Sequence, residues 1–298
     1  MLLIGTMVSA IVIGQLLVNF TPTKLVQLVQ GAAVLTMVLN LTALWKQEAR
    51  DRSATAKREV QPAFRQVWAI FIARPKTMRL LVAVGLGAAA FSMQDVLLEP
   101  YGGQILGLSV GSTTWLTALW AIGMLGGFSL AARQLGEGSD PHRLAGLGGF
   151  VGIFAFLFVI FAGPLHAVAL LKIGATLIGF GGGLFSVGTL TAAMAISDDD
   201  ALLGRTGLAL GAWGAVQATC AGLAIALGAF ARDLISAAAV ARDLGPALDG
   251  PVTGYAFVYC FEIALLLCTL VALGPLVRSS RGNAVSPAGR FGLSEFPI

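Results

Sequence analysis

Two carboxylates near the end of a predicted membrane span, Asp95 and Glu99, are the residues best suited to carry chemistry. They are four positions apart, so on a helix that Pro100 ends they share one face. A carboxylate that borders hydrocarbon is costly, and such residues are functional candidates. The pair could ligate magnesium, directly or through water, or receive a cationic group of a partner helix. The alternative is that both are solvated at the non-cytoplasmic interface and cap neighbouring helix ends.

A third acidic residue, Glu262, lies about eight residues into the last predicted span, roughly 12 Å deep at 1.5 Å per residue. A carboxylate at that depth needs a proton, a partner or a ligand. Lys172 and Gln217 lie within two other predicted spans and are the candidate partners, although Lys172 can also snorkel to the surface. Gln217 and Glu262 therefore join the candidate binding residues.

Three further side chains complete the candidate set. Tyr101 precedes two glycines in a sequence typical of a tight turn, and it fits an interfacial anchor. Trp120 lies deep in a predicted span, where it either stacks on a planar macrocycle or packs in the core. His166 stands at the start of another span and can serve as an axial metal ligand, although a lone interfacial histidine is more commonly just solvated.

The elements that must position these residues are membrane helices. The chain has 298 residues, of which 57% are hydrophobic and 11% charged, and its mean hydropathy is +0.85. Soluble domains are about 25% charged. Continuous apolar runs of about 20 residues predict spanning helices, because barrel strands would alternate. The sequence predicts an all-α polytopic membrane protein with eight spans, near 2–20, 25–45, 80–98, 110–131, 144–163, 166–195, 205–230 and 254–277.

A charged segment divides these spans two and six. Residues 46–79 carry nine of the nineteen Lys and Arg residues. When this segment is cytoplasmic, fifteen Lys and Arg lie on that side and three on the other, which follows the positive-inside rule and places both termini in the cytoplasm. The predicted organisation is two helices in 1–45, a basic loop in 46–79, six helices in 80–278 and a cytoplasmic tail in 279–298.

Part of the loop is itself predicted to be helical. Residues 62–73 place several apolar side chains on one helical face between Arg65 and Arg74. This pattern indicates a short helix in the membrane interface, or one that packs on the ends of neighbouring helices.

Small residues and cysteines indicate architecture. Small residues recur every four positions in 175–183, 207–215 and 218–222, a pattern that permits close helix packing or leaves a groove for another helix or an apolar tail. Cys220, Cys260 and Cys268 lie inside predicted spans and are interpreted as small hydrophobic residues, without metal or disulfide spacing. The first residues lack the basic region of a signal peptide, so we expect no cleaved signal. The net charge of +4 follows from topology and does not indicate nucleic-acid binding.

Specific motifs resemble a known family. Two helices, a long basic loop and six helices match the major facilitator fold from its fifth helix onward. The segment QDVLLEPYGGQILGLSVGSTTWLTALWAIGMLGG, residues 94–127, resembles the PucC/LhaA family of purple photosynthetic bacteria, a bacteriochlorophyll-synthase-like branch of the major facilitator superfamily. GFGGGLF from Gly179 and RTGLALGAWGAVQ from Arg205 are also similar to it. The resemblance extends from about residue 2 to 278.

The resemblance implies an assembly factor for light-harvesting antenna complexes in the intracytoplasmic photosynthetic membrane. Its expected ligands are bacteriochlorophyll, antenna polypeptides or both, and the candidate residues would then bind pigment or partner. Family members have about twelve helices, and the first four are missing here, so this chain is not expected to enclose a central cavity alone.

Two other functions compete with antenna assembly. The alternative is a facilitator-type transporter of a small amphipathic molecule. An enzyme is disfavoured, because prenyl transfer to a chlorin needs paired Asp-rich motifs that hold magnesium pyrophosphate. The sequence has a single such cluster, residues 198–200.

Overall fold

The computed structural model describes residues 2–44, 64–196, 206–241, 245, 248 and 250–282. The predicted all-helical class is confirmed for this part of the chain, which contains no strand. Its elements are α1 (Leu2–Leu16), α2 (Pro22–Leu44), α4 (Phe64–Ile72), α5 (Pro75–Ser92), the 3₁₀ helix η1 (Met93–Val96), α6 (Leu98–Leu106), α7 (Val110–Gly136), α8 (Pro141–Ala162), α9 (Val168–Ile196), α10 (Thr206–Val240) and α11 (Val252–Gly282).

Seven helices in the described residues are long and apolar enough to cross a membrane, which makes the chain a multi-pass membrane protein. They are α2, α5 with η1, α7, α8, α9, α10 and α11. The first predicted span is an apolar helix of 15 residues, α1, shorter than the ~20 residues that cross a bilayer. The predicted count of eight spans is therefore not confirmed.

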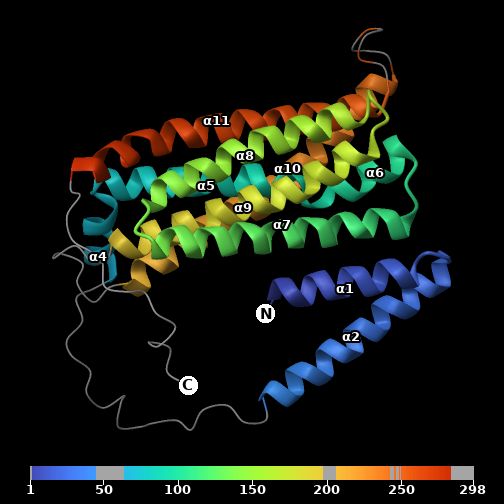
Figure 1. The fold of residues 1–298 in the computed structure, drawn as a ribbon, viewed down its shortest axis with the longest axis horizontal. Helices are drawn as coiled ribbons and strands as arrows, with labels where there is room; N and C mark the ends of the chain where they lie inside the picture. The colour runs from blue at the N-terminus through green and yellow to red at the C-terminus, as the bar shows by residue number, and fades with distance from the viewer. Residues whose placement is uncertain are drawn as a thin grey trace.

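The helices of residues 75–282 form one elongated bundle (Figure 1). Helix α9 packs between α7 and α8, while α5 contacts α10 and α11, and α11 closes the bundle against α8. The core between these helices is apolar, with Leu116, Phe156, Leu171, Ile178 and Leu266 fully buried. This packing fixes the relative positions of α5, α7, α9 and α10, which carry the candidate site.

The first two helices lie on the edge of this bundle. Helix α1 packs along α7, where a Cβ on Gly111 would lie 2.9 Å from the carbonyl oxygen of Gly14. Helix α2 has no buried residue and diverges from the bundle (Figure 1). The chain thus contacts its main bundle through α1 and leaves α2 exposed on all sides.

Proline and capping residues explain where the central helices begin and end. Pro100 has no N–H to donate to the carbonyl of Val96, so an α-helix cannot run regularly through this stretch. The chain instead tightens into η1 and restarts as α6, with Pro100 in the first turn, where no donor is needed. Gly107 then ends α6 with φ +66°, a left-handed conformation that glycine adopts without strain. Pro100 was predicted to end the helix, and it begins a new one.

The short helix predicted in residues 62–73 is present as α4. Val67 and Phe71 are buried, and Phe71 packs against Leu81, Ala209 and Ala212. Helix α4 therefore packs on the ends of α5 and α10, which is the second of the two predicted placements. The remainder of the basic loop in 46–63, the acidic cluster in 198–200 and the tail from 283 lie outside the described residues.

Candidate functional site

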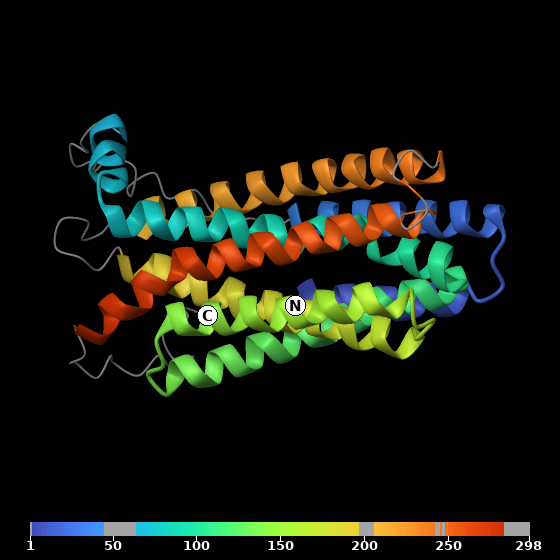
Figure 2. The same ribbon diagram turned by 90° about the horizontal axis from the view of Figure 1, so that it is seen from above.

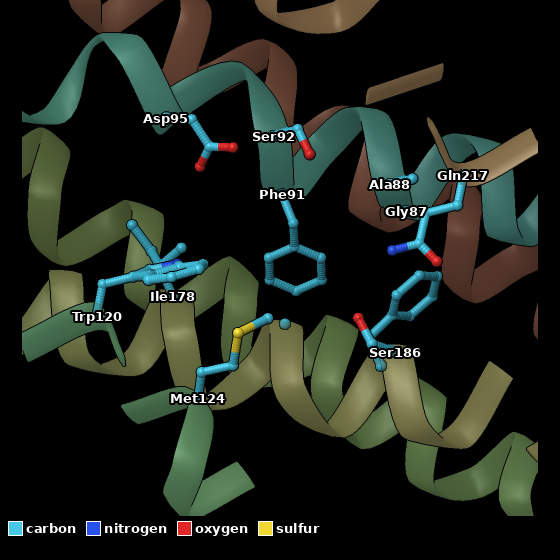
Figure 3. A pocket seen from close by; sticks show the side chains of 12 residues that line it. Gly87, Ala88, Phe91, Ser92, Asp95, Trp120, Met124, Ile178, Ser186 and Gln217 are labelled. Carbon is cyan, nitrogen blue, oxygen red and sulfur yellow. The ribbon is translucent and has the colours of Figure 1, made fainter. Parts of the chain in front are cut away.

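A cavity between four helices brings together three of the predicted candidates: Asp95 from η1, Trp120 from α7 and Gln217 from α10 (Figure 3). It encloses about 90 Å³. Asp95 and Gln217 lie at opposite ends, and the ring of Phe91 lies between them. Met124, Ile178, Phe185 and two serines, Ser92 and Ser186, complete most of the wall.

Helical periodicity in α5 explains one side of this cavity. Phe91, Ser92 and Asp95 lie three, four and seven residues after Ala88, so the four residues share a face. Sequence analysis named only Asp95 from this face. The same spacing, counted back from Asp95, would have identified Phe91 and Ser92 as lining residues.

Asp95 is held by its neighbour and remains accessible. The Gln94 side-chain amide donates to one carboxylate oxygen of Asp95 at 2.5 Å and to the carbonyl of Phe91 at 3.4 Å. Gln94 is buried, whereas Asp95 is exposed. Gln94 therefore orients the carboxylate, and the exposed side of that carboxylate is available to a ligand.

Gln217 presents an unsatisfied acceptor at the other end. Its side-chain oxygen is buried and has no hydrogen-bond partner among the described residues. An acceptor buried without a donor costs about 1–3 kcal/mol. A ligand that donates a hydrogen bond in the cavity would recover this free energy.

Glu262 of α11 lies outside the cavity wall and is completely buried. Neither carboxylate oxygen has a side-chain hydrogen-bond partner in the described structure, where the backbone N–H of Gln94 interacts with the carboxyl group, and the nearby Tyr259 hydroxyl also lacks a partner. Asp95 lies close enough for the two carboxyl groups to interact electrostatically. The predicted pairing of Glu262 with Lys172 is wrong, because Lys172 is exposed, and no hydrogen bond joins Glu262 to Gln217.

Glu99 belongs to a different environment from Asp95. The helix break at Leu97 separates them, so the predicted shared face does not form. Thr117 of α7 donates to a Glu99 carboxylate oxygen at 2.5 Å. Glu99 therefore ties α6 to α7 and does not line the cavity.

Tyr101 is buried in α6, so both its predicted turn and its role as an interfacial anchor are wrong. Its hydroxyl donates to the carbonyl of Val159 at 2.9 Å, and its ring packs edge-on against Tyr255 and Tyr259 at centroid distances of 5.3 and 5.7 Å. Burial raises the pKa of the Tyr101 hydroxyl above its usual value, so it remains a donor at neutral pH. Tyr101 thus stabilises the junction of α6, α8 and α11.

His166 is exposed in the turn between α8 and α9 with φ +48°, a left-handed conformation in which His is enriched among non-glycine residues. It does not line the cavity. The structure therefore does not bring His166 together with Asp95, Trp120 and Gln217.

Comparison with known proteins decides the family. A family model described as PUCC protein matches residues 1–281. The chain belongs to the PUCC protein family. It is 49% identical over 301 residues to a Rhodobacter capsulatus protein described as an uncharacterized protein in the puhA-bchM intergenic region. It is 42% identical over 279 residues to Protein PucC of Cereibacter sphaeroides.

A more distant relative of this chain has a different name. It is the bacteriochlorophyll synthase 44.5 kDa chain of Rhodobacter capsulatus, which is 30% identical over 247 residues. The first two alignments cover 100% and 94% of this chain but only 62% and 59% of the relatives. The chain thus spans about three-fifths of the length of these relatives. The expectation that four preceding helices are missing stays a prediction.

Sequence analysis of this PUCC chain missed a polar cluster centred on Arg232 of α10. Arg232 donates to the Tyr255 hydroxyl and to Asp233, and to the side chain of Gln104 at 2.8 Å. Its guanidinium also lies 4.3 Å from the centroid of the Tyr255 ring. The cluster links α6, α10 and α11. Sequence analysis ended the seventh span at residue 230, so Arg232 was treated as a loop charge.

Proposed function

We propose that this chain acts as a membrane assembly factor for bacterial light-harvesting antenna complexes. The observation that carries the proposal is the match of the PUCC family model over residues 1–281, a family tied to light-harvesting complex assembly. The relatives named PucC support it, at 42% identity over nearly the whole chain. Because the chain spans about three-fifths of the length of those proteins, we propose that it shares their role in antenna assembly.

The proposed ligands are bacteriochlorophyll, an antenna polypeptide or both. The cavity of about 90 Å³ is far below the roughly 300–1,000 Å³ of pockets that enclose drug-sized molecules, so a macrocycle does not fit inside it. Exposed Asp95 and the unsatisfied Gln217 oxygen fit a smaller group. We propose that they receive one donor-bearing edge, either a magnesium-bound water or the cationic end of a side chain, while the rest of the ligand lies outside the cavity.

Trp120 supplies a flat apolar surface beside Asp95. Its ring is half-buried, so one part packs in the bundle and another faces the cavity. An aromatic face next to hydrogen-bond acceptors suits a flat, amphipathic ligand. Asp95, Trp120 and Gln217 are therefore the proposed binding residues. Glu262 is proposed to affect ligand binding through its electrostatic interaction with Asp95.

The proposed location is the intracytoplasmic photosynthetic membrane, with the basic segments in the cytoplasm. The bias of fifteen Lys and Arg residues on one side against three on the other supports this orientation. The proposed role is non-enzymatic, in line with the relatives named PucC. Conversion of a bacteriochlorophyll precursor by the purified chain would contradict it.

A second candidate is facilitator-type transport of a small amphipathic molecule. The observation that favours it is that the cavity lies between spanning helices, and not on a loop. Uptake of such a molecule into vesicles that contain the chain, with no effect on antenna content, would favour transport over assembly.

The test of the assembly proposal is purification of the tagged chain in mild detergent from a photosynthetic host. We expect a near-infrared chlorin absorption band that survives washing, and antenna polypeptides that co-purify. Asp95→Asn combined with Gln217→Leu should reduce the band at least tenfold. The matched control is Glu137→Gln. It changes an exposed carboxylate immediately after the C-terminal end of α7. A colourless chain without antenna polypeptides would contradict the proposal.

A further inference from the structure

Helices α5 and α11 run side by side (Figure 2). Residues of both helices line a second hollow. We call it the α5–α11 groove; its walls include Met78, Arg79, Val82, Cys268, Val271 and Pro275, and this open groove has a volume of about 610 Å³. That volume is within the range of small-molecule sites. The groove is separate from the Asp95 cavity, since no residue lines both.

The groove is apolar along its length and open to its surroundings. Met78 and Val82 are 44% and 48% exposed, and Val271 is 77% exposed, the largest value among the exposed large hydrophobic residues of the described chain. The α5 residues that line it run from 75 to 86, which is about 16 Å at 1.5 Å per residue. This is about half of the ~30 Å hydrocarbon core, or the depth of one leaflet.

The end of the groove at the start of α5 is positively charged. Arg79 is exposed and is the only charged residue that lines it. Lys76 is exposed one turn earlier, and neither side chain makes a hydrogen bond or ion pair that is described in the structure. Helix α5 also begins there without a side-chain cap from Arg74, so its dipole adds positive potential.

We propose that the α5–α11 groove binds one anionic phospholipid of the adjoining leaflet, with an acyl chain along Met78, Val82 and Val271 and the phosphate on Arg79. An apolar trough one leaflet deep with a cation at its mouth is complementary to that molecule, and basic pockets between membrane helices recognise anionic head groups. This inference is independent of the proposed antenna function, because it uses other residues and another face.

Other occupants fit the groove less well. A transmembrane helix packs closely against small residues, whereas most of the side chains that line this groove are larger, with Cys268 and Ala272 the exceptions. A second copy of the chain in a two-fold dimer would bring Arg79 and Lys76 towards their own counterparts, which repel. An uncharged isoprenoid tail would leave Arg79 without a partner.

The experiment is native mass spectrometry of the purified full chain with phosphatidylglycerol or phosphatidylcholine of identical acyl chains. We expect phosphatidylglycerol to be retained preferentially, by about fivefold for one Arg contact. Arg79→Gln should remove this preference and Arg79→Lys should keep most of it. Arg143→Gln, which changes an exposed arginine outside the groove, should have no effect.

A second variant tests the apolar part. Val271→Trp fills the trough and should reduce retention of both lipids, whereas Leu267→Trp on the same helix changes an exposed residue outside the groove and should not. Equal retention of the two lipids by the wild-type chain would overturn the proposal. So would an unchanged preference in Arg79→Gln, or a groove occupied by pigment, antenna peptide or a second chain.

Discussion

The glycine-rich helices α9 and α10 use their small residues in different ways. On α9, a Cβ added to Gly179 would lie 2.0 Å from the carbonyl oxygen of Trp120, and one added to Gly183 would lie 2.8 Å from that of Met124. On α10, a Cβ added to Gly207, Gly211 or Gly222 would meet nothing within 4 Å. The two α9 glycines permit close helix contact, whereas these three α10 glycines face open space within the described structure.

The difference follows from what lies opposite each helix. Helix α9 meets glycines on its neighbours, because Gly127 of α7 approaches the Phe180 carbonyl and Gly148 of α8 approaches that of Gly181. Two small faces in register allow the backbones to come together. Helix α10 has such a counterpart in Gly254 of α11, which approaches the Arg232 carbonyl, but none opposite Gly207, Gly211 or Gly222 in the described residues. Of its apolar window 17% is buried, against 56% for α9. A small-residue pattern on one helix is therefore not sufficient to predict a contact.

The largest effect is expected from Gly179→Ala. The added methyl group would overlap the backbone of α7, so α7 and α9 must separate; because backbone cannot move aside as a side chain can, we expect a cost of about 3 kcal/mol or more, the upper end for overpacking. Thermal unfolding in mild detergent measures the loss. The matched control is Gly211→Ala on α10, which should leave stability unchanged or raise it by up to about 1 kcal/mol through helix propensity. Equal losses in the two variants would break the comparison.

A somewhat smaller effect is expected from Arg232→Leu. It removes the bonds from α10 to Gln104 and Tyr255, and hydrogen bonds to a charged group contribute about 1.5–3 kcal/mol. Amide hydrogen exchange should accelerate in α10 and stay unchanged in the central part of α9. Leu234→Ala is the control, because Leu234 lies on the same helix and is 60% exposed. If amide hydrogen exchange accelerated equally in α9 and α10, the comparison would fail, because the two helices would then be equally firmly packed.

Trp213→Phe should have a smaller effect still. The Trp213 indole N–H donates to the Thr189 hydroxyl at 3.2 Å and is a polar link between α10 and α9. Its loss should cost about 1 kcal/mol in unfolding free energy, a typical value for one hydrogen bond. If Trp213→Phe were as damaging as Gly179→Ala, the link between α9 and α10 would matter as much as the glycine contacts.

The smallest change in stability is expected from Glu262→Gln. Glu262 is fully buried without a side-chain hydrogen-bond partner in the described structure, and Gln keeps its shape and an oxygen that can accept from the backbone N–H of Gln94. We expect the unfolding free energy to stay within about 0.5 kcal/mol of the wild type, or to rise. A loss above about 2 kcal/mol would indicate that Glu262 has a partner that holds the bundle together.

Sequence patterns predicted the helical class because long apolar runs have few alternatives in a membrane. They did not predict the break after α5, since the effect of Pro100 depends on where the helix restarts. Asp95 and Glu99 were therefore placed on one face, and the structure separates them.

The candidate site was predicted in part, for a similar reason. Asp95, Trp120 and Gln217 were each named from residue type and depth, and only the packing of α5, α7 and α10 shows that they share a cavity. Tyr101 was predicted at the membrane interface, but its hydroxyl donates a hydrogen bond to a carbonyl of α8. The two residues in this contact are 58 positions apart in the sequence. Spacing along the chain carries no information on such contacts.

The most direct test of antenna assembly is the near-infrared absorption of intact membranes from a photosynthetic host whose copy of this chain has been deleted. The account predicts that antenna absorption falls in the deletion strain and is restored by the wild-type chain. The variant that combines Asp95→Asn and Gln217→Leu should reach the membrane in normal amount and fail to restore it. Normal antenna absorption in the deletion strain, or full restoration by this variant, would contradict the account.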